Sequence, residues 1–252
     1  MPEPGPAITI GLPRLAYAGE ILFENLRFRL EPGLWTCLLG PSGVGKTTLL
    51  RLIAGLEPGA LVVTERGEGL KGRIALMAQE DLLLPWASVL DNVLLGYRLR
   101  GMARGDRTSL DARGMDLLAR VGLADRARDL PATLSGGMRQ RVALARTLME
   151  DRPVVLMDEP FSALDAITRH RLQDLAAELL TGRTVLLVTH SPLEALRLGH
   201  RVFVLAGKPA KPRGPILPAG RPPRDAADPA LLVQEAELLR ELTEAARLQE
   251  AS

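Results

Sequence analysis

The stretch LWTCLLGPSGVGKTTLLRLIAGL, Leu34–Leu56, decides the fold of this chain. Its beginning, Leu34–Leu39, is continuously apolar or small, which is typical of a strand buried on both faces of a sheet. The middle, Gly40–Thr48, matches the pattern G-x-x-x-x-G-K-[ST]. Leucines at helical spacing follow and stop at Gly55. The stretch therefore predicts a strand, a glycine-rich loop and a helix in that order.

The residue types of this loop suit a polyphosphate ligand. Gly40 and Gly45 allow the backbone to wrap a phosphate chain with its N–H groups pointing inward. The ammonium of Lys46 then reaches the β- and γ-phosphates, and the hydroxyl of Thr47 suits Mg²⁺. A chance glycine turn is the alternative, and the strand–loop–helix context disfavours it.

Composition places the chain among ordinary globular proteins. Of its 252 residues 46% are hydrophobic and 25% charged, and Lys and Arg (32) barely exceed Asp and Glu (30). Because no run of Lys or Arg occurs, a nucleic-acid partner is not expected. The start MPEPGPAITI has no basic or apolar region of a secretory signal, and no apolar run approaches the roughly 20 residues of a membrane span. The single cysteine, Cys37, excludes an intrachain disulfide and is interpreted as a small buried residue.

Strand and helix patterns alternate along most of the chain. Buried-strand runs occur at VVLMD (154–158), TVLLVTH (184–190) and RVFVLAG (201–207), the last of which we expect to be the final strand. This alternation predicts an α/β domain with a mainly parallel sheet. A block of purely helical pattern, about 87–133, is interpreted as an inserted subdomain.

Two segments close the chain. Residues 209–229 hold seven of the nineteen prolines and are interpreted as an irregular linker, with its RPPRD turn a solvated basic stretch. The tail predicts an amphipathic helix that packs against the domain. The resulting division is a domain at 1–207, followed by a linker and helix at 208–252.

Two acids follow the strand VVLMD directly. Asp158 suits a water linked to Mg²⁺ beside the phosphate loop, and Glu159 is then placed to polarise an attacking water. Two solvated carboxylates are the alternative, and the phosphate loop upstream argues against it. His190 and Gln79 also follow strands, at the sheet edge where ligands of parallel α/β proteins bind, but alone either is equally compatible with a structural role.

A second anion cradle is predicted at LSGGMRQRVALAR, Leu134–Arg146. Ser135 is a good N-cap residue, and Gly136 and Gly137 leave the first backbone N–H groups of a helix uncovered. The loop at Gly40–Thr48 is already predicted to hold a phosphate chain. The residues alone therefore do not show which phosphate this second helix start would hold.

These motifs together resemble the ATP-binding subunit of an ABC transporter over roughly residues 8–207. They occur in the family's order: GPSGVGKTT, Gln79, LSGGMRQR, VVLMDEP, SALD at Ser162–Asp165, and His190. The resemblance implies a P-loop NTPase core of the ABC type, with a mainly parallel sheet, an antiparallel β edge and an inserted α-helical subdomain.

The resemblance also implies a role for each matching residue. The catalytic residues would be Glu159, His190, Gln79 and Lys46. The ligands of Mg²⁺ would be Thr47, Gln79 and Asp158. ATP would contact Gly40, Ser42, Gly43, Val44, Gly45, Lys46, Thr47, Thr48, Ser135, Gly136, Gly137 and Asp165. Tyr17 resembles the aromatic residue that stacks on adenine, with simple packing as the alternative.

The partners follow from the family. Two such subunits face each other head to tail, so Ser135 and the amides near Gly137 would hold the γ-phosphate of ATP on the partner chain, with Asp165 at the same contact. The resemblance implies a second ATP-binding subunit, identical in the simplest case, transmembrane permease subunits, and a periplasmic solute-binding protein that acts indirectly. The expected location is the cytoplasmic face of the inner membrane, as a peripheral protein.

The segment after Gln79 narrows the type of transporter. LLPW followed by VLDNV resembles importers of the nitrate, sulfonate, taurine and hydroxymethylpyrimidine group, with MAQEDLLLPW most like the pyrimidine branch. An apolar patch around Leu84–Trp86 would suit a permease helix, or simply pack. The segment between Lys46 and Gln79 is shorter than usual in the family, which predicts trimmed antiparallel strands. Glu80 has no functional explanation.

Two other classes of protein share parts of this pattern. Soluble ABC ATPases that act on DNA or ribosomes usually carry a coiled-coil or zinc insertion or two tandem halves, whereas this chain has one motif set, one cysteine and no heptad run. Nucleotide and small-molecule kinases share the phosphate loop, but they leave LSGGMRQR unexplained.

Overall fold

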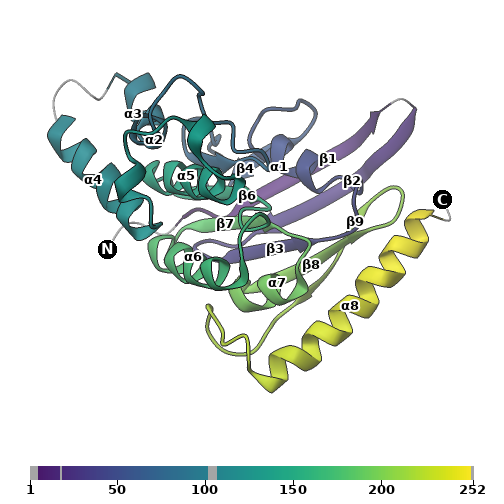
Figure 1. Ribbon diagram of the computed structural model, residues 1–252. Coiled ribbons are helices and arrows are strands. Elements are labelled where there is room, and N and C mark those ends of the chain that lie inside the picture. Colours follow the sequence, from purple (N-terminus) through teal and green to yellow (C-terminus); the bar gives the residue numbers. More distant parts are fainter. Residues whose placement is uncertain (1–4, 18, 102–106, 251–252) are drawn as a thin grey trace. The chain divides into compact units, whose positions relative to one another are not determined.

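The computed structural model describes residues 5–17, 19–101 and 107–250 (Figure 1). The chain divides into two compact units. The first comprises Met1–Ile74, Pro153–Glu159 and Thr181–Ser252, and the second Ala75–Arg152 and Pro160–Leu180. Among the described residues, no helix is both long and apolar enough to cross a membrane.

An antiparallel sheet forms one part of the first unit. Its strands, in the order β2-β1-β4, are β2 (Glu20–Leu30), β1 (Ile8–Tyr17) and β4 (Leu61–Thr64). Ile8 pairs with Leu30 on one side and with Thr64 on the other. The sheet confirms the antiparallel β edge, and the segment after α1 contributes only the four-residue strand β4 to it.

A second, mainly parallel sheet carries the core of the first unit. Its strands there, in spatial order, are β6 (Val154–Asp158), β7 (Thr184–Val188), β3 (Trp35–Leu39), β8 (Arg201–Ala206) and β9 (Lys211–Ile216). All residues of β3, β6 and β7 are buried, and the pairs β6–β7, β3–β7 and β3–β8 are parallel. The apolar runs seen in the sequence are therefore the centre of a sheet covered on both faces.

The last strand differs from the expectation. RVFVLAG was predicted to end the sheet, but β9 follows it and pairs antiparallel with β8. Prolines 212 and 215 lie within β9. They are tolerated because β9 is at the edge of the sheet, where no further strand needs their missing N–H groups. Part of the expected linker is thus a strand of the first unit.

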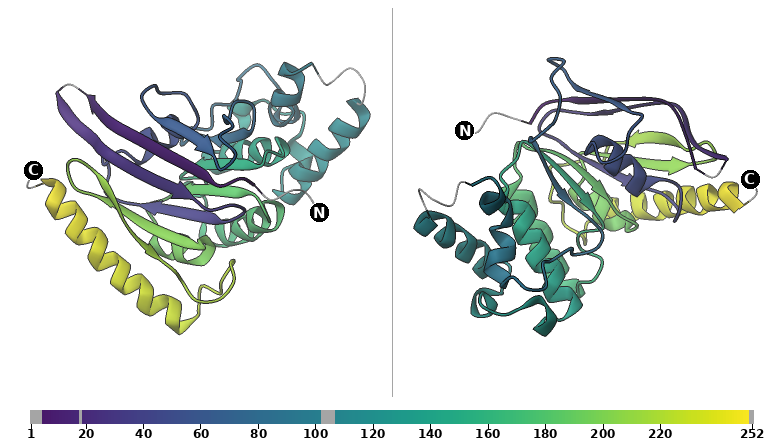
Figure 2. Two further views of the ribbon diagram at one scale, coloured as in Figure 1. Left: turned by 180° about the vertical axis from the view of Figure 1, so that it is seen from behind. Right: turned by 90° about the horizontal axis from the view of Figure 1, so that it is seen from above.

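Three helices complete the first unit: α1 (Lys46–Ile53), α7 (Pro192–Leu198) and α8 (Pro229–Glu250). Figures 1 and 2 show α8, in yellow, running along α7 and β8, and contacts between these elements agree. Leu231, Leu238 and Ala245 recur every seven residues and are buried. The predicted amphipathic tail and its packing against the domain are confirmed.

The second unit is mostly helical. Its elements are β5 (Ile74–Met77, from Ala75), α2 (Val89–Val93), α3 (Leu95–Leu99), α4 (Arg107–Arg120), two 3₁₀ turns (Ala124–Arg126 and Pro131–Thr133), α5 (Gly136–Met149) and α6 (Ala166–Leu179). Both α2 and α4 pack on α5. The unit is thus wider than the helical block expected at about 87–133, because it also includes α5 and α6.

Candidate nucleotide-binding site

The phosphate loop depends on two glycines. A Cβ atom on Gly40 would lie 2.5 Å from the Leu205 carbonyl oxygen, and one on Gly45 would lie 2.7 Å from Cζ of Phe23. Gly45 also has a φ of +104° as the residue that caps the start of α1. Only glycine fits both positions, so the loop can follow the end of β3 closely and turn directly into the helix.

Lys46, the first residue of α1, is held inside the loop. Its Nζ donates hydrogen bonds of 2.8 Å to the carbonyl oxygens of Gly40 and Pro41. Burial lowers the pKa of Lys46, while the negative charges of Glu159 and Asp158 act in the opposite direction. The loop therefore presents a fixed cation together with its backbone N–H groups.

Thr47 and Asp158 join the loop to the end of β6. The Thr47 hydroxyl Oγ1 donates a hydrogen bond of 2.6 Å to Oδ2 of Asp158. Burial raises the pKa of Asp158, the hydrogen bond from Thr47 lowers it, the charge of Glu159 raises it and Lys46 lowers it. A hydroxyl and a carboxylate this close together are typical of the oxygen ligands that proteins supply to Mg²⁺ beside phosphates.

Glu159 and His190 form a second pair in the same unit. Oε2 of Glu159 lies 3.3 Å from Nδ1 of His190, and the side chain of His190 is far more exposed than that of Glu159. Glu159 has a φ of +49°, which is uncommon for a residue other than glycine, and its N–H donates to the Val188 carbonyl oxygen at 2.9 Å. This turn at the end of β6 directs the carboxylate of Glu159 toward the end of β7.

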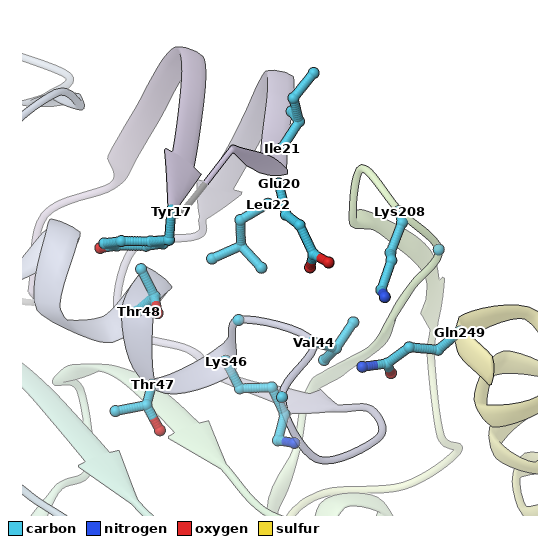
Figure 3. A pocket seen from close by; sticks show the side chains of 13 residues that line it. Tyr17, Glu20, Ile21, Leu22, Val44, Lys46, Thr47, Thr48, Lys208 and Gln249 are labelled. Carbon is cyan, nitrogen blue, oxygen red and sulfur yellow. The ribbon is translucent and has the colours of Figure 1, made fainter. Parts of the chain in front are cut away.

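A cavity of about 370 Å³ lies beside the loop (Figure 3). Its lining comprises Tyr17, Glu20, Ile21, Leu22, Gly43, Val44, Gly45, Lys46, Thr47, Thr48, Gly207, Lys208 and Gln249. Tyr17 is 46% exposed and lies across the cavity from Gln249. An aromatic ring at one side and the phosphate loop below are suited to a nucleoside triphosphate.

The start of α5 in the second unit has the predicted cap. The Ser135 hydroxyl accepts a hydrogen bond of 3.3 Å from the Met138 N–H, and Ser135 and Gly136 are exposed. Space around Gly136 is open, whereas a Cβ on Gly137 would lie 3.1 Å from the Ala163 carbonyl oxygen. The helix start therefore has the exposed backbone that the predicted anion cradle requires.

Gln140 links this helix to the SALD segment. Its Oε1 accepts a hydrogen bond of 2.8 Å from the Ala163 N–H, and its Nε2 donates to the Ser162 hydroxyl at 3.3 Å. Asp165 follows as the N-cap of α6, because its Oδ1 accepts from the Thr168 N–H at 3.0 Å. The hydrogen bonds from Thr168 lower the pKa of Asp165. The sequence did not predict this capping role.

The sequence-predicted residues thus fall into two groups. The first unit brings together Tyr17, the loop Gly40–Thr48, Asp158, Glu159 and His190. The second unit holds Gln79, Ser135, Gly136, Gly137 and Asp165, with Gln79 exposed just after β5. Asp158, Glu159 and His190 do not line the cavity, but Asp158 accepts a hydrogen bond from Thr47, which does.

Six residues of the cavity lining were not predicted: Glu20, Ile21, Leu22, Gly207, Lys208 and Gln249. Gln249 is 207 residues from Ser42, whose carbonyl oxygen it contacts, so no local pattern indicates this proximity. Arg224 of the RPPRD turn was also misinterpreted as solvated. It is buried, and its guanidinium donates hydrogen bonds to five carbonyl oxygens, those of Leu196, Gly199, Pro218, Ala219 and Gly220.

Comparison with known proteins agrees with these features. The ABC transporter family model matches residues 23–162. An uncharacterized ABC transporter ATP-binding protein of Haemophilus influenzae is 48% identical over 231 residues, which are 90% of this chain and 95% of the relative. The aliphatic sulfonates import ATP-binding protein SsuB 1 of Rhodococcus jostii is 46% identical over 91% of this chain and 90% of its own length. The aliphatic sulfonates import ATP-binding protein SsuB 2 of Pseudomonas syringae is 42% identical over 94% of this chain and 98% of its own length.

A solved structure shows the same architecture. The dimeric ATP-binding cassette MJ0796, in a post-hydrolysis state bound to ADP and Pi, matches with a TM-score of 0.74 and 27% identity. The match covers 85% of this chain and 100% of that chain.

Proposed function

Because this chain belongs to the ABC transporter family, as an ATP-binding and ATP-hydrolysing import subunit, we propose that it drives uptake of an aliphatic sulfonate or a similar small organic anion through a separate membrane permease. One observation supports ATP hydrolysis at this site: the hydrogen bond from Thr47 to Asp158, which joins the phosphate loop to the acidic end of β6. The solute is proposed from the relatives named for sulfonate import, since this subunit does not itself bind the solute.

ATP would bind with its phosphates on the loop. The backbone N–H groups of Gly43–Thr48 and the ammonium of Lys46 would hold the phosphates, and Tyr17 would stack on the adenine ring. Because Tyr17 is nearly half exposed, its ring face is accessible to a base entering from solvent. Glycine at positions 40 and 45 keeps the loop close enough for this wrapping.

Thr47 and Asp158 fit a Mg²⁺ ion. The described residues contain no cluster of three or more His, Cys, Asp or Glu side chains suited to a metal. None is required, since Mg²⁺ in nucleotide sites takes one or two protein ligands and completes its shell with phosphates and waters. We propose the Thr47 hydroxyl and the Asp158 carboxylate as its ligands. Gln79 is added as a ligand from the family resemblance alone. When bound, the ion would neutralise charge that develops on the phosphates.

Glu159 would act as the base toward the attacking water. Its carboxylate is half of the pair with His190, and its left-handed backbone is held by the hydrogen bond to Val188. A carboxylate fixed in this way can accept a proton and orient a water for in-line attack. His190 would contact the γ-phosphate from the end of β7. Most of the rate enhancement then comes from positioning and charge stabilisation.

The start of α5 would complete the site of a second subunit. Ser135 and the amides of Gly136 and Gly137 would hold the γ-phosphate of ATP on the partner chain, with Asp165 at the same interface. The exposed helix start supports this assignment, as does the dimeric assembly of the related cassette. Two identical copies are the simplest assembly.

The permease would dock on the second unit. Three large apolar side chains there, Leu82, Trp86 and Leu99, are 59%, 76% and 79% exposed, and apolar groups of this kind are suited to a permease helix. Leu82 and Trp86 follow Gln79 closely in sequence, so a permease helix on this surface would be sensed by Gln79. A periplasmic solute-binding protein would act on the permease alone. The subunit would work at the cytoplasmic face of the inner membrane as a peripheral protein.

Reconstitution with the permease encoded beside the gene tests this function. We expect the chain to co-purify with that permease and, in proteoliposomes with the solute-binding protein, to hydrolyse ATP faster when taurine or another alkanesulfonate is supplied. The variant Lys46→Ala is the inactive control. Stimulation by hydroxymethylpyrimidine instead would shift the solute to the pyrimidine branch. Failure to associate with any permease, together with salt-sensitive binding to DNA or ribosomes, would overturn the proposal.

A further inference from the structure

The last turn of α8 contacts the phosphate loop. Nε2 of Gln249 donates a hydrogen bond of 3.1 Å to the carbonyl oxygen of Ser42. The same nitrogen would lie 3.6 Å from a Cβ atom built on Gly43. Figure 3 shows Gln249 reaching from α8 to the wall of the cavity, beside Val44 and Lys208. The C-terminal helix is therefore a direct neighbour of the loop that would bind phosphates.

The side-chain oxygen of the same amide has no hydrogen-bond partner within the described part of the chain. This oxygen, Oε1 of Gln249, is buried, and none of the described residues donates a hydrogen bond to it. Turning the amide over would not relieve this, because it would bring Oε1 against the Ser42 carbonyl oxygen, and two acceptors repel. The contact with Ser42 thus fixes the side chain with an acceptor that lacks a donor. Buried acceptors without a donor are rare and call for an explanation.

Bound ATP would supply the donor. Its phosphate oxygens only accept hydrogen bonds at neutral pH, so they cannot pair with Oε1. The remaining donors of ATP are the ribose hydroxyls and the adenine amine. Tyr17, which would stack on adenine, lies across the cavity from Gln249, whereas Gln249 adjoins the loop. The ribose, which joins the base to the phosphates, is the group that matches this position.

We propose that Gln249 binds the nucleotide, with its side-chain oxygen accepting a hydrogen bond from a ribose hydroxyl of ATP. This rests on the proposed function, because it assumes that the cavity holds ATP. The anchoring of α8 through Leu231, Leu238 and Ala245 fixes the helix that carries the amide. The C-terminal helix is then a wall of the nucleotide site, and it selects a ribonucleotide.

Binding of ATP, 2′-deoxyATP and 3′-deoxyATP to the full chain tests this assignment. In isothermal titration calorimetry we expect the unmodified chain to prefer ATP over one deoxy analogue by about 3- to 10-fold, the net worth of one hydrogen bond. Gln249→Met keeps the length of the side chain without the amide, and it should bind ATP and that analogue equally. Arg247→Ala, at an exposed position on the same helix, should keep the preference.

Three results would overturn the assignment. The first is equal affinity of the unmodified chain for all three nucleotides. The second is a preference for ATP over the deoxy analogue that is unchanged in Gln249→Met. The third is a preference for ATP over inosine triphosphate that disappears in Gln249→Met. The last would identify the adenine amine as the donor. Thermal unfolding of each variant distinguishes misfolding from loss of the contact. Gln249→Ala serves as a second variant without the amide. A chain that binds no ATP at all would instead reject the proposed function.

Discussion

The Asp81 carboxylate accepts a hydrogen bond of 2.9 Å from Nε of Arg139, in the first turn of α5. Farther along the same helix, Arg146 donates to the backbone carbonyl oxygens of Asp81 and Leu82, at 2.6 and 2.8 Å. The segment just after Gln79 is thereby attached to the helix that begins at Ser135. In the proposed function, that helix connects the permease-facing segment to the contact with the partner's ATP.

Asp81→Ala should weaken the coupling between transport and hydrolysis. The pair with Arg139 is partly exposed, so its loss should change the free energy of unfolding by no more than about 1 kcal/mol. Because the segment is also held by Arg146, we expect a reduction of about 2- to 5-fold in solute transported per ATP in proteoliposomes. Asp111→Ala removes an exposed pair on α4 and is the matched control. Identical ratios in the two variants would reject a role for Asp81.

Glu159→Gln should abolish most ATP turnover while ATP binding persists. The substitution keeps the size of the side chain but removes its capacity to accept a proton, which is worth roughly 100- to 10,000-fold in rate. Steady-state phosphate release measures this effect, and size-exclusion chromatography with ATP should show a trapped dimer. A variant that still hydrolyses ATP at the normal rate would remove Glu159 from the role of base.

Asp158→Asn should stabilise the nucleotide-free protein at neutral pH. Because burial raises the pKa of Asp158, the folded state binds this proton more tightly than the unfolded chain does. Its contribution to stability is therefore lost as pH rises from the unfolded pKa, about 3.9, through the folded pKa. Asparagine avoids this loss and still accepts the hydrogen bond from Thr47.

Thermal unfolding at several pH values checks this prediction. The midpoint of Asp158→Asn should exceed that of the unmodified chain at pH 7, and the difference should shrink as pH falls toward the unfolded pKa. Activity with Mg²⁺ should fall in the same variant. A destabilised variant at neutral pH would contradict the assigned effect of burial.

Arg224→Ala should destabilise the first unit by about 2–4 kcal/mol. The guanidinium ties the end of α7 to the turn at 218–220 through carbonyl oxygens that would lose their donor. Arg224→Lys should recover only part of the loss, since an ammonium cannot span the same set of acceptors. Urea unfolding measures the change. Arg221→Ala, an exposed neighbour in the same turn, should be neutral, and an equal loss there would refute the role of Arg224.

Cys37 should resist alkylation in the folded protein. It is fully buried in β3, burial raises the pKa of its thiol, and the negative charge of Glu194 raises it further, with Arg224 acting in the opposite direction. Intact-mass spectrometry after maleimide treatment should show no adduct under native conditions and complete reaction in concentrated urea. Rapid labelling of the folded chain would contradict the buried position.

Local chemistry made the centre of the site predictable. The strand, loop and helix around Lys46 follow from short-range patterns. A glycine-rich loop of this pattern between a buried strand and a helix is typical of a phosphate-binding site. The acids after β6 were predicted for the same reason, since residues that follow a parallel strand lie at the edge where ligands bind. Their pairing with Thr47 and His190 agrees with that logic.

The failures involve residues that act through distant partners. Gln249 and Arg224 have ordinary neighbours in sequence, and only the packing of α8 and of the turn at 218–220 gives them a role. The strand β9 was missed because its prolines suggested a linker, although an edge strand accommodates them. The cap at Asp165 is a local feature by contrast, since aspartate before a helix is a favoured N-cap residue.

The inert thiol of Cys37 has a practical consequence for spectroscopy. It is the chain's only cysteine, so a new cysteine at any exposed position would be the sole site for a spin label or fluorophore. No cysteine-free background has to be built first, and the core of β3 stays intact. Trp86 in the second unit and Arg247 in the first are exposed positions at which such a label would report changes during an ATP cycle.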